Sequence, residues 1–362
     1  RGVTGRGVVI GVIDTGVDWT HLDFRVDRDR DGIEEGTRLL SIWDQTIPGV
    51  RPAGFRYGAA FTRQDIEAAL AQGDEDKIRH VDANPNAPSH GTLALGIAGS
   101  DGSSSSSGLV GMAPDAELVA VKSPLTFDTI VDGVAHVFNV AGARPAVASL
   151  SLGSHLGAHD GTSNFERALV ALSQGPGRAI VVAAGNEGDD RIHVGGQLNA
   201  LGVTEVACEL PQDSESSRFS FNFWYGGDPG VELRLSVVGP SGERVGPVTT
   251  GELLDRTIAD GGVFVSNAAQ GPNPNNGMNE ALVTVYGSLF GAQEPLQPGR
   301  WTIELASRGL STRYDGWALG LPFSSSNADN RSTVRLPATA EELIAVGAYV
   351  ARTRGHSISG FL

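Results

Sequence analysis

The hydrophobic pattern of the 362-residue chain changes near residue 209 and changes back near residue 336. Before residue 209, continuous apolar runs such as Val8–Ile13 alternate with segments of helical period such as Ile130–Phe138. Continuous β-branched runs are typical of strands that are buried on both faces of a parallel sheet. The alternation therefore predicts an α/β fold with a doubly wound parallel sheet over residues 1–208.

The individual elements of this first part follow from the same periodicities. We expect strands at 8–13, 117–121, 146–152, 179–184 and 205–208, and helices at 62–71, 90–98, 130–138 and 165–172. Thr62 and Asp65 have the spacing of a capping pair at the start of the first helix. Most of the chain between 15 and 61 is interpreted as loop-rich.

Residues 209–335 follow a period of two instead. Phe219, Phe221 and Phe223 alternate with polar residues, and turn signals such as Gly239-Pro240-Ser241-Gly242 separate the runs. This pattern predicts a self-contained antiparallel β-sandwich. We expect its core to include the following apolar residues: Phe221, Phe223, Leu233, Leu235 and Trp301.

The α/β pattern returns within residues 336–362. Leu343, Ile344 and Val346 lie in an apolar segment that predicts one more strand of the first sheet. A strand that returns to the first sheet makes the sandwich an insertion rather than a second domain in tandem. We therefore expect three stretches: 1–208 and 336–362 in the α/β domain, and 209–335 in the inserted domain.

Charge and composition exclude several partners. The formal net charge is -15, so a nucleic-acid backbone or an anionic membrane would be repelled over most of the surface. No apolar stretch approaches the roughly 18 residues that a membrane span needs. Cys208 is the single cysteine, which excludes an internal disulfide and a thiolate metal cage. We expect Cys208 to be a small buried residue of a strand. The oligomeric state is left open.

Asp14 follows the first predicted strand, in Val12-Ile13-Asp14-Thr15-Gly16-Val17-Asp18. Open α/β sheets place their ligand crevice at the carboxyl ends of the strands, which favours a functional role. A strand followed by Asp-Thr-Gly also occurs in aspartic proteases and phosphatases, and an aspartate here also serves simply to cap the turn. On this motif alone, a functional role and a turn-capping role of Asp14 are equally supported.

Two further polar segments occupy comparable places. His90-Gly91-Thr92 precedes an apolar Gly/Ala helix, where an imidazole at the helix start faces a crevice. Ala184-Gly185-Asn186 ends a buried strand with an amide that can donate a hydrogen bond to an oxyanion. Taken singly, the histidine is more often an ordinary satisfied residue, and the asparagine is more often a turn former beside glycine.

The order of these segments resembles that of the subtilisin-like serine peptidases. Asp14, His90, Ser151-Leu152-Gly153 and Ala184-Gly185-Asn186 occur on successive predicted strands in the order of that family. The resemblance covers 1–208 and 336–362, including Gly111-Met112-Ala113-Pro114 and Pro337-Ala338-Thr339-Ala340. Residues 157–163 and 42–46 look most like the clostridial spore-germination (Csp) group, whose catalytic domain is also interrupted by a jelly-roll sandwich.

The resemblance implies a role for each matching residue. His90 is then the general base, Asp14 orients it, and Asn186 holds the oxyanion. The substrate backbone and side chain are then received by two walls, which comprise Ser151, Leu152, Gly153, Ala183, Ala184 and Gly185. It also implies a protein or peptide substrate, catalysis without a cofactor, and an extracellular or cell-envelope location.

The nucleophile of that family is missing from these residues. The family carries it in a Gly-Thr-Ser-Met-Ala-x-Pro segment, and the sequence holds no such segment. Its one Gly-Thr-Ser is Gly161-Thr162-Ser163, where Ser163 and Glu166 have capping-box spacing ahead of an apolar helix. Ser163 also precedes Asn186, which is the wrong order. We expect this chain by itself to be inactive, as part of a longer peptidase or of a pseudoenzyme.

Three aspartates form one further candidate site. Asp27, Asp29 and Asp31 alternate ahead of Gly32, as in EF-hand calcium loops, but Arg38 holds the twelfth position. A structural calcium site and a solvated acidic loop are equally supported. The remaining histidines, including His193, have no spacing that suggests a metal.

Three functions compete at this point. They are an endopeptidase, a noncatalytic regulator that binds peptides in the cleft, and a binding module that acts through the sandwich. The peptidase leads because Asp14, His90 and Asn186 are all retained, whereas a pseudoenzyme is free to lose them.

Overall fold

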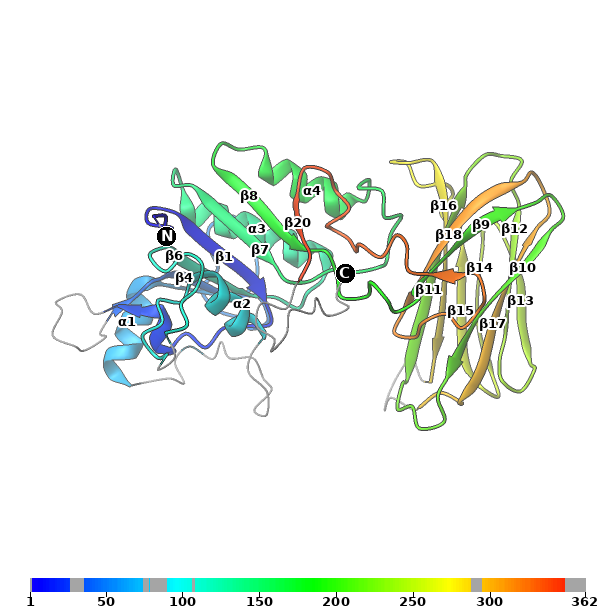
Figure 1. Ribbon diagram of the computed structural model, residues 1–362, viewed down its shortest axis with the longest axis horizontal. Coiled ribbons are helices and arrows are strands. Elements are labelled where there is room, and N and C mark those ends of the chain that lie inside the picture. The colour runs from blue at the N-terminus through cyan, green and yellow to red at the C-terminus, as the bar shows by residue number, and fades with distance from the viewer. Residues whose placement is uncertain are drawn as a thin grey trace. The chain divides into compact units, whose positions relative to one another are not determined.

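The computed structural model describes residues 2–26, 36–73, 78, 90–105, 108–287 and 295–348. The chain divides into two compact units, which are described separately below (Figure 1). The first unit comprises Arg1–Gly153, Asn164–Ala183 and Ala340–Val346. The second comprises Ser154–Ser163, Ala184–Thr339 and Gly347–Leu362.

A seven-stranded sheet forms the first unit, in the order β20-β8-β7-β1-β6-β4-β5. Its strands are β1 (Val9–Asp14), β4 (Leu39–Asp44), β5 (Ala59–Thr62), β6 (Glu117–Lys122), β7 (Ala146–Leu150), β8 (Arg178–Ala183) and β20 (Ile344–Val346). All neighbours are parallel except β4 and β5. The chain passes from β6 on one side of β1 to β7 on the other. The carboxyl end of β1 therefore lies at a topological switch point, where open sheets bind ligands.

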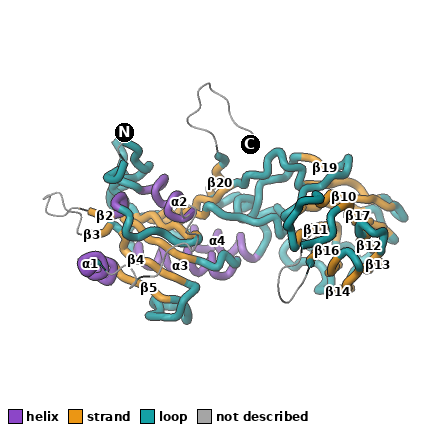
Figure 2. Tube along the Cα trace, turned by 90° about the horizontal axis from the view of Figure 1, so that it is seen from below, coloured by secondary structure: helices purple, strands orange, loops and turns teal. Residues whose placement is uncertain are grey.

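Helices cover both faces of this sheet (Figure 2). The unit contains α1 (Arg63–Gln72), α2 (His90–Gly99), α3 (Phe127–Ala141), α4 (Asn164–Ser173) and a short 3-10 helix (Leu22–Phe24), and β2 (Arg25–Val26) pairs with β3 (Gly36–Thr37). Ile10 and Val12 of β1 share a core cluster with Leu95 of α2. On the other face, Gly11 lies so close to Val137 of α3 that an added Cβ would stand 2.2 Å from it. Alternate residues of β1 therefore face α2 and α3.

The first unit agrees with the predicted architecture and differs in detail. The capping box of Thr62 and Asp65 is confirmed at the start of α1. β20 pairs in parallel with β8, which confirms the returning strand. β4 was missed within the stretch interpreted as loop-rich. A register irregularity between Leu39 and Ser41 interrupts its pairing with β6, and this breaks the regular alternation that sequence patterns detect.

The second unit is an antiparallel sandwich of two sheets, in the orders β10-β17-β12-β13 and β14-β15-β16-β11-β18-β9-β19. Its strands are β9 (His193–Leu198), β10 (Val203–Leu210), β11 (Arg218–Gly226), β12 (Leu233–Val238), β13 (Arg244–Thr249), β14 (Glu252–Ile258), β15 (Gly261–Asn267), β16 (Met278–Tyr286), β17 (Gly299–Ser307), β18 (Thr312–Leu319) and β19 (Ala328–Asp329). The five predicted core residues, Phe221, Phe223, Leu233, Leu235 and Trp301, all lie in its buried cluster.

The second unit begins earlier in the chain than the expected boundary at residue 209. The strand expected at 205–208 in the first sheet is part of β10, which pairs antiparallel with β17 in the sandwich. That assignment is a correction, and its physical reason is visible in the pattern. Val206, Cys208 and Leu210 are buried while Glu205 and Glu209 are exposed, and the small residue Ala207 between the two glutamates is buried as well. Exposed glutamates on one side of a strand are typical of a sheet with one solvated face. Residues 154–163 also belong to the second unit.

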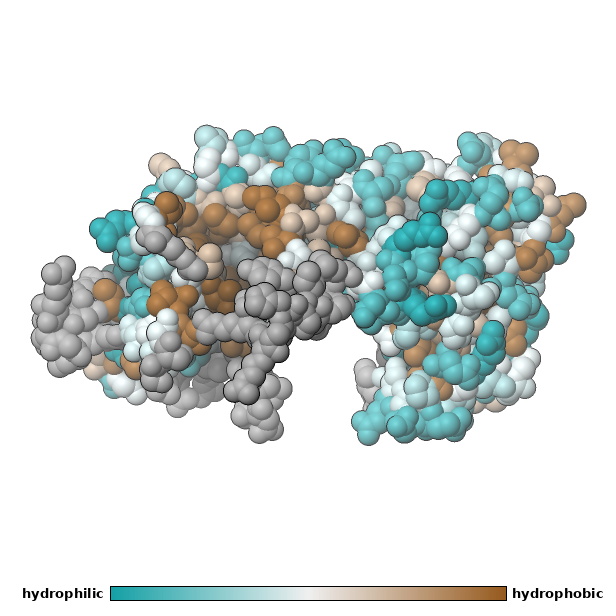
Figure 3. Space-filling model, in the orientation of Figure 1, coloured by the Kyte–Doolittle hydropathy of each residue, from teal (hydrophilic) through white to brown (hydrophobic). Residues whose placement is uncertain are grey.

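Exposed apolar side chains gather on the first unit. Leu93 and Ile97 of α2, Met112, and Ile344 and Val346 of β20 are each 49% to 71% exposed. Figure 3 shows apolar residues clustered on the viewed face of this unit and scattered on the second. Clustered exposed apolar surface is typical of a face that another segment or ligand covers. No described helix is long and apolar enough to cross a membrane.

Candidate active site

Asp14 ends β1 with its carboxylate on the α2 face of the sheet. It follows Ile10 and Val12 at the same parity, and those residues pack toward α2. The side chain is buried, with 2% of the residue exposed. Oδ1 accepts hydrogen bonds from the backbone N–H of Thr15 at 2.7 Å and from its hydroxyl at 3.1 Å. These contacts hold the carboxylate in one orientation.

His90 is the first residue of α2 and meets Asp14 directly. Its Nδ1 lies 2.8 Å from Oδ1 and 2.9 Å from Oδ2 of Asp14. The His90 side chain is 59% exposed, whereas the Asp14 side chain is 3% exposed. A buried carboxylate thus engages one ring nitrogen of an imidazole that is otherwise open to solvent.

Gly91 permits this approach. A Cβ at residue 91 would stand 2.1 Å from the carbonyl oxygen of Gly16 and 3.0 Å from the Cβ of Asp14. The Thr92 hydroxyl accepts a hydrogen bond from the backbone N–H of Asp18 at 2.8 Å. The start of α2 is therefore packed directly against the loop after β1. This close packing leaves room only for a glycine at position 91.

The geometry of this pair suits proton transfer. An imidazole that donates from Nδ1 to a carboxylate keeps Nε2 as an acceptor, which is the form a general base requires. The carboxylate also stabilises the imidazolium that forms when Nε2 takes up a proton. The pair therefore has the arrangement of a base and its orienting acid, with Nε2 on the side of the ring away from Asp14.

Other predicted site residues lie at the same edge of the sheet. Ser151, Leu152 and Gly153 directly follow β7, and Ala183 ends β8. β7 pairs in parallel with both β1 and β8, so all three strands end on the same side. Ser151 is exposed, and Leu152 and Gly153 are partly exposed. Backbone at these positions is accessible to a ligand at the carboxyl edge.

Asn186, Ala184 and Gly185 belong to the second unit. Asn186 is exposed, and its backbone N–H donates to Oε2 of Glu187 at 2.8 Å. Oε1 of Glu187 accepts from Nη2 of Arg335 at 2.8 Å. The sequence patterns did not single out Glu187 or Arg335, because 148 residues separate these partners.

A stack of rings adjoins Glu187 in the second unit. The His155 ring stacks on His159 at 5.2 Å, and His159 stacks on Trp317 at 4.0 Å between ring centroids. Burial lowers the pKa of His155 and lowers the pKa of His159 to about 3. Both imidazoles are therefore neutral at neutral pH. In the sequence, the spacing of His155 and His159 gives no indication that their rings stack.

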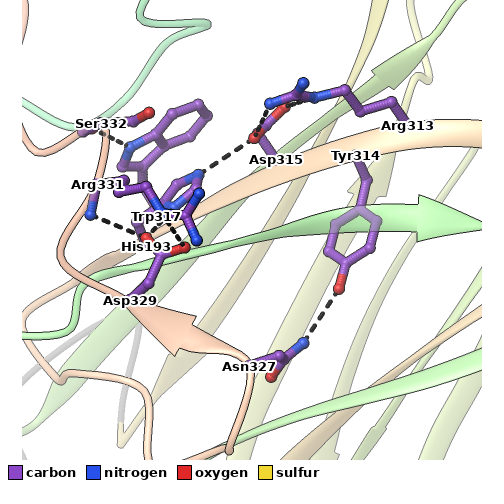
Figure 4. A network of polar contacts seen from close by, with 9 residues as sticks. All are labelled: His193, Arg313, Tyr314, Asp315, Trp317, Asn327, Asp329, Arg331 and Ser332. Carbon is purple, nitrogen blue, oxygen red and sulfur yellow. Dashed lines mark hydrogen bonds and ion pairs between the residues drawn. The ribbon is translucent and has the colours of Figure 1, made fainter.

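A second histidine and aspartate cluster lies on the sandwich (Figure 4). Nδ1 of His193 lies 2.8 Å from Asp329, and Nε2 lies 3.2 Å from Asp315. His193 stands opposite both Asp329 and Trp317 in the strand register, which brings these groups together. Burial opposes the charge on His193, but its bonds to Asp315 and Asp329 outweigh burial and raise its pKa.

The remaining predicted site residues are placed as follows. Ser163 directly precedes α4, the position of a helix cap. Asp27, Asp29 and Asp31 lie outside the described residues. Among the residues that the structure describes, no group of three or more His, Cys, Asp or Glu side chains is arranged so that it could hold a metal ion.

Comparison with known proteins places this geometry in context. The subtilase family matches residues 5–224. The CspB protease of Clostridium perfringens has a similar structure, with a TM-score of 0.75 at 24% identity over 97% of this chain and 70% of that chain. A PII-type proteinase of Lacticaseibacillus paracasei and a PI-type proteinase of Lactococcus lactis subsp. cremoris are each 29% identical over 196 residues. These matches cover 51% of this chain but only 9% of either proteinase.

Proposed function

The chain belongs to the subtilase family, and from that premise we propose that it carries the base and the orienting acid of a serine endopeptidase. The observation that carries the proposal is the contact of Nδ1 of His90 with both carboxylate oxygens of Asp14. It occurs at the carboxyl end of β1, at the switch point of the sheet. Protein or peptide chains are the proposed substrates.

In the proposed mechanism, Nε2 of His90 accepts the proton of a serine hydroxyl as the oxygen attacks the substrate carbonyl. The C–O bond forms, and negative charge moves to the carbonyl oxygen. The imidazolium then returns the proton to the nitrogen of the leaving amine as the C–N bond breaks. Water repeats the sequence on the acyl-enzyme, and Asp14 stabilises the imidazolium in both halves.

We assign the oxyanion to the side-chain amide of Asn186 and the substrate to two walls. An amide donor that meets the oxyanion acts chiefly on the transition state. Ser151–Gly153 form one wall and Ala183–Gly185 the other. The accessible backbone of the first segment supports pairing with an extended peptide.

We propose that the nucleophile lies in a segment outside these 362 residues. The sequence holds no Gly-Thr-Ser-Met motif, and Ser163 occupies the cap position of α4. The exposed apolar residues of α2 and β20 support a further segment that packs on the first unit. This chain alone is then without peptidase activity.

The direct test compares the 362-residue chain with a longer polypeptide that includes a serine-bearing segment. We expect the longer form to hydrolyse peptides and to react with a serine-directed phosphonate, and the shorter form to do neither. In the longer form, Asn186→Ala should lower kcat by roughly 100- to 1,000-fold, a magnitude taken from subtilisin itself. A folded longer form that neither cleaves nor reacts would refute the peptidase and favour a peptide-binding regulator.

Calcium binding and location are separate proposals. The acidic run of Asp27, Asp29 and Asp31 supports a structural calcium, which catalysis itself does not require. Calcium should raise the melting temperature of the wild-type chain but not of Asp29→Ala, which lacks the oxygen ligand; equal shifts would exclude the site. The family resemblance supports an extracellular or cell-envelope location, and recovery of the native protein only from the cytoplasm would refute it.

A further inference from the structure

Three distant segments of the second unit are joined at the place where Asn186 lies. The backbone N–H of Arg335 donates to the carbonyl of Ala184 at 3.0 Å. Ser154 and Leu336 exchange backbone hydrogen bonds of 3.0 and 2.9 Å as an isolated antiparallel bridge. The segment with Asn186 is thus tied to the chain that leaves the sandwich, and that chain is tied to the residue that follows Gly153.

The Glu187 carboxylate is the centre of this junction. Its Oε2 accepts from the Asn186 N–H at 2.8 Å, and its Oε1 accepts from Arg335 at 2.8 Å. Nε2 of His155 lies 3.4 Å from Oε2. The side chains of Glu187, Arg335 and His155 are 24%, 18% and 9% exposed. Charge-assisted bonds that are shielded from water are stronger than exposed ones.

Gly185 shows how closely these groups enclose the backbone before Asn186. Its φ is +119°, and a Cβ there would stand 2.8 Å from Oε2 of Glu187 and 2.9 Å from Nε of Arg335. Carboxylate and guanidinium therefore lie against the chain at residue 185. This contact restricts the conformation of an exposed segment that has no regular secondary structure.

We propose that Glu187 and Arg335 are positioning residues that hold Asn186, with His155 supporting the carboxylate. This inference rests on the proposed function, because it gives Asn186 the oxyanion role. An oxyanion donor must stay in place while charge develops, and displacement of about 1 Å costs roughly 100-fold in rate. His155 is anchored in turn through His159 to Trp317 of β18. These ring contacts connect a strand of the sandwich to the carboxylate that holds Asn186.

A direct role of Glu187 in binding a basic substrate side chain is a different reading, and the contacts argue against it. Both carboxylate oxygens already accept hydrogen bonds, and Arg335 neutralises the charge. A positioning role predicts changes in kcat, whereas a substrate-binding role predicts changes in KM that depend on the peptide sequence.

The first test uses the 362-residue chain and needs no activity. Arg335→Met should speed hydrogen–deuterium exchange of the backbone N–H of Asn186 at least about tenfold, because the Glu187 carboxylate that accepts from it loses its main restraint. Arg335→Lys should restore part of the protection. Arg234→Met is the matched control, since Arg234 forms an ion pair with Glu232 at 2.9 Å elsewhere in the same unit. Unchanged exchange at Asn186 in Arg335→Met would overturn the proposal.

The second test is a double-mutant cycle in the longer, serine-bearing polypeptide. Arg335→Met should lower kcat about tenfold with little change in KM, and should cause no further loss in an Asn186→Ala background. Equal losses in both backgrounds, or a KM effect confined to basic peptides, would overturn positioning. A wild-type polypeptide without activity would refute the proposed function, and the exchange experiment would then decide alone whether Arg335 holds the segment.

Discussion

Each unit contains a histidine in contact with aspartate, and the two arrangements differ in what they leave free. In the first unit, Asp14 engages only Nδ1 of His90, and the imidazole is 59% exposed. In the second, Asp329 and Asp315 engage both ring nitrogens of His193, which is buried. The first imidazole thus keeps much of its ring open to solvent, whereas carboxylates hold both ring nitrogens of the second.

The difference follows from the elements that carry the two histidines, a helix for His90 and a strand for His193. His90 starts a helix at the carboxyl edge of a parallel sheet, so one side of its ring faces outward. His193 lies within β9, between β18 and β19, and Gly195 leaves room for the Asp315 carboxylate beside it. Contact with an aspartate is therefore insufficient evidence of a catalytic base. An unoccupied, accessible second nitrogen is also required.

Replacement of each histidine gives the largest expected contrast. In the longer polypeptide, His90→Ala should lower kcat by roughly a millionfold, the magnitude known for loss of the base in subtilisin. His193→Gln should leave kcat close to the wild-type value, because both its ring nitrogens are already used. Steady-state hydrolysis of a peptide substrate measures both. Comparable losses in the two folded variants would remove the distinction.

Two glycines of α2 provide a smaller contrast. Gly91→Ala forces the helix start away from Gly16 and should lower kcat about 100-fold by displacing His90. Gly96→Ala is the control, since an added Cβ there meets nothing within 4 Å. It should keep activity and stabilise the chain by about 0.5–1 kcal/mol through helix propensity. Full activity in Gly91→Ala would show that the close packing is dispensable.

The His193 cluster should make stability depend on pH. The raised pKa of His193 means that its contribution is complete below about pH 6.5 and is lost as pH rises through the folded-state pKa. Burial opposes the charges of Asp315 and Asp329, but the contacts with His193, together with those of Arg313 at Asp315 and of Arg331 at Asp329, outweigh burial and lower both pKa values. Their contribution is present above about pH 3.9 and is lost as pH falls through those values.

Urea unfolding of the whole chain tests this dependence. Between about pH 4 and pH 6.5, His193→Gln should reduce the free energy of unfolding by about 1.5–3 kcal/mol. The difference from wild type should shrink at alkaline pH, where His193 is neutral in both states. A penalty that stays constant from pH 5 to pH 10 would show that the cluster acts without its charge.

Ser163 gives the smallest expected effect. Ser163→Ala should cost about 0.5–2 kcal/mol by removing the cap of α4, and should leave peptidase activity of the longer form intact. Thermal unfolding and peptide hydrolysis measure the two quantities. Loss of activity in a correctly folded Ser163→Ala protein would make Ser163 the nucleophile and would overturn its assignment as a cap.

Local patterns were sufficient for much of the first unit. The continuous run before Asp14 predicted a buried strand, and the apolar Gly/Ala segment after His90 predicted a helix. Both signals depend on neighbours within a few residues. The strand β4 escaped detection because its irregular pairing with β6 disrupts the pattern at Leu39–Ser41.

The order of the motifs carries a resemblance to the subtilisin-like family, and that resemblance predicted that Asp14 and His90 act together, while local patterns placed each residue at the end of its own element. The side-chain period of a strand and the start of a helix are local properties, so a single sequence determines them. Tertiary structure alone decided that β9 and β10 join the sandwich, that His193 meets Asp329 across 136 residues, and that Arg335 meets Glu187 across 148. Such contacts depend on which strands pair and in which register, and that choice reflects burial summed over the whole sheet rather than any local pattern.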